Sequence, residues 1–185
     1  MKIKNIAVQL RGLRDIMFCR YLGKTSTSCN PESLLYYAED EKTLVLPALN
    51  LRSFLCAQNT DSCAKKFYDP RKFRNKALAI QSYCQIEPDL IPLTANGKPI
   101  VFDGFNEKIY LFRSVPRLPK GIPNEITRPV VRVPWELSFT LRLIENELIS
   151  EMELYSLFEK GGIMIGLGTY RGVFGKFEIA KWERI

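Results

Sequence analysis

A glycine-rich run from Gly161 to Lys176 carries residue types suited to binding a phosphate-bearing ligand. Glycine has no Cβ, so its backbone adopts positive φ and lets another chain approach closely. The run predicts a loop in which glycine N–H groups approach phosphates while two cations supply charge; the candidate binding residues are Gly166, Gly168, Gly172, Arg171 and Lys176. The alternative is a helix C-cap followed by an irregular turn, because helices often end on glycine.

A second candidate is the segment 65–76, in which six basic and three aromatic residues accompany one acidic residue. Cations pair with phosphates and aromatic rings stack on unpaired bases, so this composition is typical of single-stranded nucleic-acid binding. The candidate contacts are Lys65, Lys66, Arg71, Lys72 and Arg74, with Phe67, Tyr68 or Phe73 as stacking residues. The alternative is a solvated basic loop whose aromatic rings pack under the domain.

The chain contains no histidine, which excludes the Ser-His-Asp and Cys-His nucleophile systems and the commonest zinc ligand. Its five cysteines include no C-x-x-C pair, so we expect no disulfide scaffold, no metal site and no cofactor. This cysteine usage favours a reducing, cytoplasmic location. The sequence has neither a run of ~18 apolar residues nor a signal-peptide pattern, so we expect no membrane partner.

The bulk composition predicts one globular domain with a polyanionic partner. The chain has 185 residues, of which 46% are hydrophobic, and we expect a single domain over residues 1–185. Its 27 lysines and arginines exceed its 20 acidic residues and give a net charge of +7. A basic balance favours association with polyanions but does not determine specificity.

Hydrophobic periodicity predicts the elements that position these residues. Period-two alternation predicts strands over 3–11, 43–46, 77–86, 108–113 and 131–143, and a final strand after the glycine run. Asn96-Gly97 predicts a hairpin turn. Helical spacing predicts helices over 48–58 and 151–160, the second beginning with a Ser150/Glu153 capping box and ending at Gly161. The four prolines of 114–129 predict a projecting or edge-lining loop.

The order of these elements is β-α-β-β-α-β. We therefore expect an α+β fold, a ferredoxin-like antiparallel sheet with two helices on one face. Loops and a hairpin enlarge this core, with an inserted basic and proline-rich region at about 60–129. Because many functions occur on this fold, the fold alone does not decide between them.

Two segments resemble the motifs of RAMP proteins, the repeat-associated subunits of CRISPR effector complexes. Residues 44–55 (Leu-Val-Leu-Pro-Ala-Leu-Asn-Leu-Arg-Ser-Phe-Leu) are similar to the family's segment that leads into its first helix, and residues 166–178 are similar to its C-terminal glycine-rich signature. Ala48 departs from the first motif and Val173 is inserted in the second. The resemblance implies a ferredoxin-like, RNA-recognition-motif-like fold that binds single-stranded RNA, with Asn50 and Arg52 near the glycine run.

We consider three functions. The first is non-catalytic binding of single-stranded nucleic acid, RNA in preference to DNA, with self-association or partner protein subunits along the strand. The second is a self-assembling structural or virion-type protein, a viral or mobile-element relative whose interface is Trp135, Phe105 and the proline-rich loop. The third is a ribonuclease whose acid comes from Glu39, Asp40 or Glu41, although three consecutive acids are more typical of a solvated turn.

Overall fold

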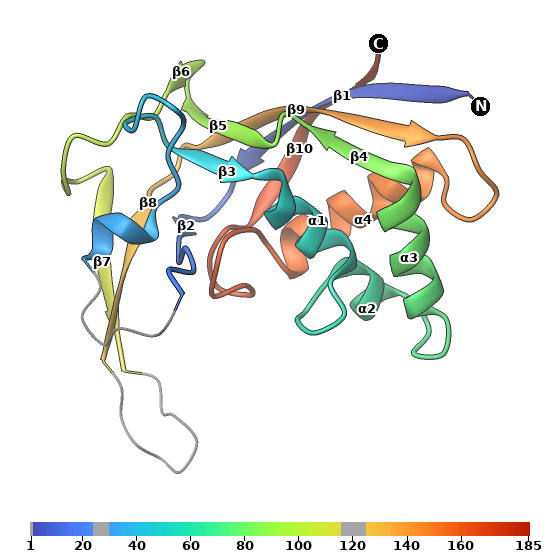
Figure 1. Ribbon diagram of the computed structural model, residues 1–185, viewed down its shortest axis with the longest axis horizontal. Helices are drawn as coiled ribbons and strands as arrows, with labels where there is room; N and C mark the ends of the chain where they lie inside the picture. The colour runs from blue at the N-terminus through green and yellow to red at the C-terminus, as the bar shows by residue number, and fades with distance from the viewer. Residues whose placement is uncertain (1, 24–29, 116–124) are drawn as a thin grey trace.

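A computed structural model describes residues 2–23, 30–115 and 125–185, and Figure 1 shows its architecture. Within these residues, seven strands form an antiparallel sheet, and helices cover one of its faces: α1 (Ala48–Cys56), α2 (Cys63–Phe67), α3 (Phe73–Tyr83) and α4 (Glu151–Met164). The expected α+β, ferredoxin-like fold is therefore confirmed. None of the described helices is long and apolar enough to cross a membrane.

The main sheet is built around β1 (Ile3–Gly12), which pairs antiparallel with β10 (Phe177–Arg184) and with β9 (Glu136–Ile144). The other edge of β9 pairs with β4 (Cys84–Glu87) and β5 (Leu90–Ala95). β5 in turn pairs with two short strands, β3 (Val45–Pro47) and β6 (Lys98–Pro99). The succession β1, α1, β4, β9, α4, β10 gives the expected ferredoxin-like order.

A smaller antiparallel sheet lies beside the main one. Its order is β2 (Ile16–Met17), β8 (Ile126–Val131) and β7 (Ile109–Ser114). A 3-10 helix, η1 (Pro31–Leu34), precedes β3. Figure 1 shows this sheet at the end of the molecule opposite α3.

The two faces of the main sheet differ in chemistry. On the helical side, alternate residues of β1 and β9 are buried against the Phe54 and Phe158 rings, which lie 5.7 Å apart. On the open side, the charged residues pair with one another, as Arg142 does with Glu87 at 3.0 Å. Within the described residues, β1 and β9 place no aromatic ring on this open face. These two described strands therefore offer no aromatic platform on which bases could stack.

The strand predicted for residues 77–86 is wrong. Helix α3 covers these residues as far as Tyr83, and only then does β4 begin, at Cys84. Leu78, which the alternation places inside, is exposed, whereas Ala77 and Ile80 are buried. The alanines of this segment favour a helix. Packing of this helix against α1 and α2 decides which of its side chains are buried.

The long strand predicted for 131–143 is also wrong, because it is two strands in different sheets. β8 ends at Val131 and β9 begins at Glu136, with Pro134 between them. Proline has no N–H to donate to a ladder, so it separates the strands. β8 also takes in 126–129, part of the predicted proline-rich loop; Pro116, Pro119 and Pro123 lie outside the described residues.

The interface predicted for a self-assembling protein loses one of its residues. Trp135 is fully buried, and its indole N–H donates to the carbonyl of Arg14 at 2.8 Å, so it cannot contact another subunit. The partly buried Phe105 ring packs edge-to-face on Phe102, with ring centroids 5.2 Å apart. Most of the proline-rich loop, the third part of that interface, lies outside the described residues.

Gly161 does not end the second predicted helix. Helix α4 begins with the predicted capping box at Ser150 and Glu153 but continues to Met164. Gly161 lies inside it, where an added Cβ would meet the Phe54 ring. The residue that leaves the helix with positive φ is Gly166, at 86°. Close packing on α1, rather than helix termination, therefore requires a glycine at position 161.

Candidate nucleic-acid interface

The glycine loop, defined as residues 166–176, connects α4 to β10 along a path that few other residues allow. φ is positive at Gly166, Gly168, Gly172 and Gly175. An added Cβ would clash with the Met17 carbonyl at Gly168 and with the Leu167 backbone at Gly175. Tyr170 also lies in the left-handed region, with φ of 56°. The loop conformation is therefore set by glycine and by close contacts on both sides.

Segments distant in sequence hold the glycine loop from two sides. The side chain of Asn50 on α1 accepts a hydrogen bond from the N–H of Gly168 at 3.0 Å. On the opposite side, the N–H of Thr169 donates to the carbonyl of Met17 in β2 at 2.9 Å. The structure therefore places Asn50 beside the loop, as the resemblance implied.

The glycine N–H groups of the loop are engaged within the protein. Gly166 and Gly172 donate to carbonyl groups of α4 and its C-cap at 3.0 Å and 2.7 Å, and Gly168 donates to Asn50. A donor that already has an intramolecular partner is not free for a phosphate. The structure therefore disfavours the expectation that these three amides approach phosphates.

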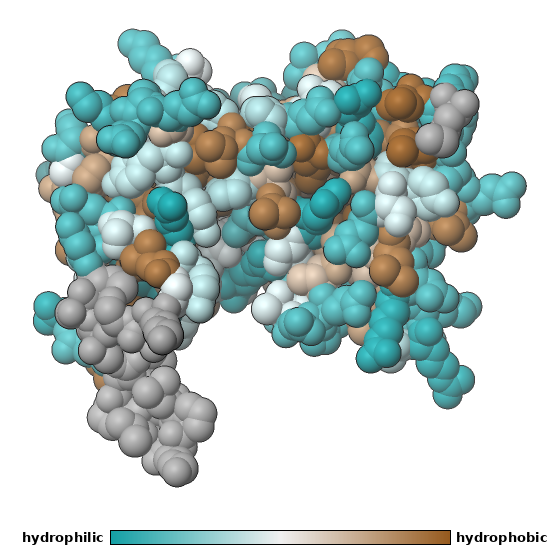
Figure 2. Space-filling view, viewed as in Figure 1, coloured by the Kyte–Doolittle hydropathy of each residue, from teal (hydrophilic) through white to brown (hydrophobic). Residues whose placement is uncertain are grey.

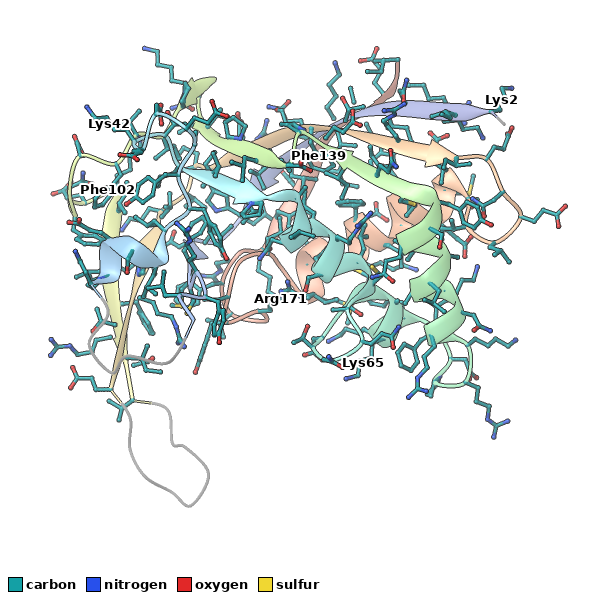
Figure 3. All side chains as sticks on the ribbon, in the orientation of Figure 1. Lys2, Lys42, Lys65, Phe102, Phe139 and Arg171 are labelled. Atoms are coloured by element: carbon teal, nitrogen blue, oxygen red, sulfur yellow. The ribbon has the colours of Figure 1, made fainter. Side chains whose placement is uncertain are left out.

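Arg171 joins the glycine loop to α1 and to the segment after it. Its guanidinium donates to the carbonyl of Asp61 at 3.0 Å and to the Ser53 hydroxyl at 3.2 Å, and Figure 3 places it between the loop and α1. Burial lowers the pKa of Arg171, while Cys63 and Asp61 oppose that shift. Its charge is therefore used to position the loop.

The Arg171→Met variant is expected to lower the free energy of unfolding by about 2 kcal/mol, because hydrogen bonds from a charged group contribute roughly 1.5–3 kcal/mol. Urea unfolding measures the loss. The exposed Arg74 provides a control, since Arg74→Met should change stability by less than about 0.5 kcal/mol. Equal stability of the two variants would contradict this positioning role.

Two lysines lie on segments that the Arg171–Asp61 hydrogen bond joins. Lys66 is exposed on α2, which begins soon after Asp61, and Lys176 is the partly buried last residue of the glycine loop. Burial, and then the charge of Lys66, lowers the pKa of Lys176. Lys65 is also exposed on α2. An anion between such groups relieves their repulsion.

No protein-family model and no curated protein matches the chain. A solved structure does: a chain of the cryo-EM structure of the type III-B Cmr-beta bound to cognate target RNA matches with a TM-score of 0.58 at 13% sequence identity. The likeness is one of fold. It covers 100% of this chain and 61% of that chain, and it supports the RAMP resemblance only at the level of the fold.

Arg52 extends away from the glycine loop. Its Nη2 donates to the carbonyl of Cys84 at 3.4 Å. The residue lines a groove of about 630 Å³ volume at the N-terminal end of α1, which Glu87 and Asp89 also line. The structure therefore does not bring Arg52 to the loop, contrary to what the resemblance implied, because the helix directs it toward β4. The two carboxylates also disfavour a phosphate there.

The predicted basic strip is divided between two places. Lys65 and Lys66 lie on α2, whereas the exposed Arg71, Lys72 and Arg74 lie in the α2–α3 connection and at the start of α3. Figure 1 places that connection at the end of the helical layer away from the glycine loop. Figure 2 shows hydrophilic side chains over this corner. The strip therefore does not form one surface with the loop.

The aromatic residues of the strip pack beneath it. Phe67 and Tyr68 are partly buried against the core, and the Tyr68 hydroxyl donates to Glu153 at 3.2 Å. Burial, and then the charge of Glu153, raises the pKa of Tyr68. Phe73 is partly buried as well. The structure thus agrees with the alternative in which these rings are tucked under the domain, and it disfavours them as stacking residues.

Asp40, the proposed acid of a ribonuclease, caps a turn. Its carboxylate accepts hydrogen bonds from the N–H groups of Lys42 and Thr43 at 2.9 Å and 2.8 Å, and from the Thr43 hydroxyl at 2.6 Å. The hydroxyl, followed by these amides, holds the pKa of Asp40 below its usual value. A carboxylate stabilised in this way is a weak general base.

Several residues of the site have no signal in the sequence. Met17 and Asp61 hold the glycine loop through their backbone carbonyls, which every residue type possesses. Ser53 contributes a hydroxyl from α1, 118 positions before its partner Arg171. Because these contacts join remote segments, only the folded chain identifies them.

Proposed function

We propose that the chain binds single-stranded RNA without cleaving it, over the surface where the glycine loop meets α1 and α2, and that it acts together with other protein subunits. The observation that carries the proposal is the glycine loop itself, which Asn50 and Arg171 hold against α1 and the segment before α2. Lys176 of the loop and Lys66 of α2 lie on the two segments joined in this way. A loop that is held in place and flanked by lysines with no ion pair among the described residues can follow a phosphate backbone without reading its sequence.

Three further observations support this proposal. The net charge of +7 favours a polyanion. Within the described residues, β1 and β9 carry no aromatic ring on the open face of the main sheet. This favours the side of the molecule with the glycine loop as the RNA-binding surface. The fold is shared with a chain of the type III-B Cmr-beta structure, which contains a bound cognate target RNA, although this chain spans only 61% of that chain's length.

The affinity for single-stranded RNA is expected to fall steeply as salt rises, because each neutralised phosphate releases a counterion. Fluorescence anisotropy with a mixed-sequence RNA oligonucleotide, repeated between about 50 and 200 mM salt, measures the slope. The same sequence as DNA tests the preference for RNA. Absence of salt-dependent binding to both strands would refute the proposal.

A second candidate function, contact with another protein, is favoured by exposed apolar side chains next to the loop. Ile163 and Met164 at the end of α4 are 55% and 49% exposed, and Val173 in the loop is 59% exposed. Light scattering at several protein concentrations, without nucleic acid, tests for self-association. A constant monomer mass over the whole range would rule out self-assembly as the function.

A further inference from the structure

A small pocket lies between the glycine loop and the segments that face it. Its volume is about 120 Å³, and its walls come from β2 and the residues after it, from the segment before β3, from β3, from α1 and from the loop. We propose that this pocket accepts one nucleobase of the bound strand. The inference rests on the proposed RNA binding and adds the part of the RNA that is recognised.

Three side chains line the pocket with polar atoms that have no partner among the described residues: Nδ2 of Asn50 and the hydroxyl groups of Tyr36 and Thr169. The Oδ1 atom of Asn50 accepts from Gly168, which orients the amide and leaves the two donors of Nδ2 available. The hydroxyl groups of Tyr36 and Thr169 also line the pocket. Within residues 2–23, 30–115 and 125–185, neither hydroxyl forms a hydrogen bond. A base presents donors and acceptors at its edge, which these three groups can match.

The rest of the pocket wall is apolar. Met17, Phe18 and Leu46 form it, and at 0%, 1% and 0% exposure they close its floor. No lysine or arginine lines the pocket among the described residues, so a phosphate would have no counter-charge there. Sites for whole small molecules have volumes of roughly 300–1,000 Å³. A pocket this small therefore holds a single base whose strand is held elsewhere.

Cys19 allows occupancy of the pocket to be measured directly. It lines the pocket and is exposed, whereas Cys56, Cys63 and Cys84 are buried. Burial, and then Cys56, raises the pKa of Cys84 to about 12, which keeps that thiol unreactive. In a Cys29→Ser background, saturating single-stranded RNA should slow alkylation of Cys19 by N-ethylmaleimide at least tenfold. An equally long ribose-phosphate strand without bases should not protect the thiol.

Removing the polar edge of the pocket should weaken binding without changing its salt dependence. The double variant Tyr36→Phe/Thr169→Val is expected to lower RNA affinity about tenfold, because two hydrogen bonds to the base are lost. The slope of affinity against salt should stay constant, since no phosphate contact is removed. Tyr155→Phe/Thr140→Val removes the same two hydroxyl groups elsewhere and should leave the affinity unchanged.

The outcomes separate this inference from the function on which it rests. Salt-dependent RNA binding with unprotected Cys19, or with equal protection by the strand without bases, overturns the nucleobase pocket alone. Unchanged affinity of Tyr36→Phe/Thr169→Val overturns it as well. If the protein binds no RNA at any salt concentration, both the pocket and the proposed function fail.

Discussion

Replacing Gly175 with alanine is expected to lower the free energy of unfolding by about 2–4 kcal/mol, since left-handed strain adds to steric overlap. Gly175 has φ of 69°, a conformation unfavourable for any residue with a Cβ. The added methyl group would also overlap the Leu167 backbone, which cannot rotate away as a side chain could. Because the N–H of Gly175 donates to the Asp15 carbonyl at 2.7 Å, moving the loop would break a further contact. Urea unfolding measures the change.

Gly172 supplies the matched control for this experiment. Its φ of 95° is equally unfavourable for alanine, but an added Cβ would meet nothing within 4 Å. Gly172→Ala should therefore cost only the backbone strain, roughly 1–2 kcal/mol. Equal losses in both variants would show that the Gly175–Leu167 approach does not contribute to stability.

Removing the cations beside the loop is expected to change the salt dependence of RNA binding. In the variant Lys66→Gln/Lys176→Gln, affinity at physiological salt should fall about tenfold, and the slope of log affinity against log salt should become shallower by about 1.4. The physical reason is that each phosphate neutralised on a single strand contributes about 0.7 to that slope. Fluorescence anisotropy across a salt series measures both quantities.

The control is Lys42→Gln/Lys98→Gln, which lowers the net charge equally. Lys42 and Lys98 are exposed, and Figure 3 places Lys42 at a corner of the molecule remote from Arg171. The slope should remain at its original value in this variant. If both double variants lose affinity to the same extent, binding depends on overall charge and not on the surface beside the glycine loop.

Elements defined by local chemistry could be predicted from the sequence. The Asn96-Gly97 dipeptide forms the expected hairpin turn, with φ of 52° and 75°, between β5 and β6. The Ser150/Glu153 capping box is present at the start of α4. Each depends on residues within four positions of one another, so the sequence contains the whole interaction.

Elements whose identity depends on a remote neighbour were not predictable in this way. The alternation over 77–86 fits a strand, but packing against α1 and α2 covers Ala77 and Ile80 and leaves Leu78 exposed. The seven alternating apolar residues of 131–143 fit one strand, but Val131 ends β8, Val133 and Trp135 lie in the connection, and the other four belong to β9 in another sheet. Periodicity shows that a face is buried without showing which element buries it.

The features of the candidate site also differ in whether the sequence could predict them. Glycine spacing predicted a loop with unusual backbone, and the resemblance placed Asn50 near it; both are found, in the positive φ values and in the Asn50–Gly168 hydrogen bond. The sequence could not show that the glycine amides are already engaged or that Arg52 faces β4. The direction of a side chain and the partner of an amide depend on contacts with remote segments.

The sequence by itself therefore determined the ferredoxin-like order of elements, the glycine loop and the excess of positive charge, because these depend on local periodicity, glycine content and composition. Only the tertiary structure decided which cations act together. It joined the segment before α2 to the glycine loop through Arg171, so that Lys66 and Lys176 lie on adjoining segments. It also formed the pocket around Asn50, Tyr36 and Thr169. These arrangements require distant segments to pack together, and no local rule encodes that packing.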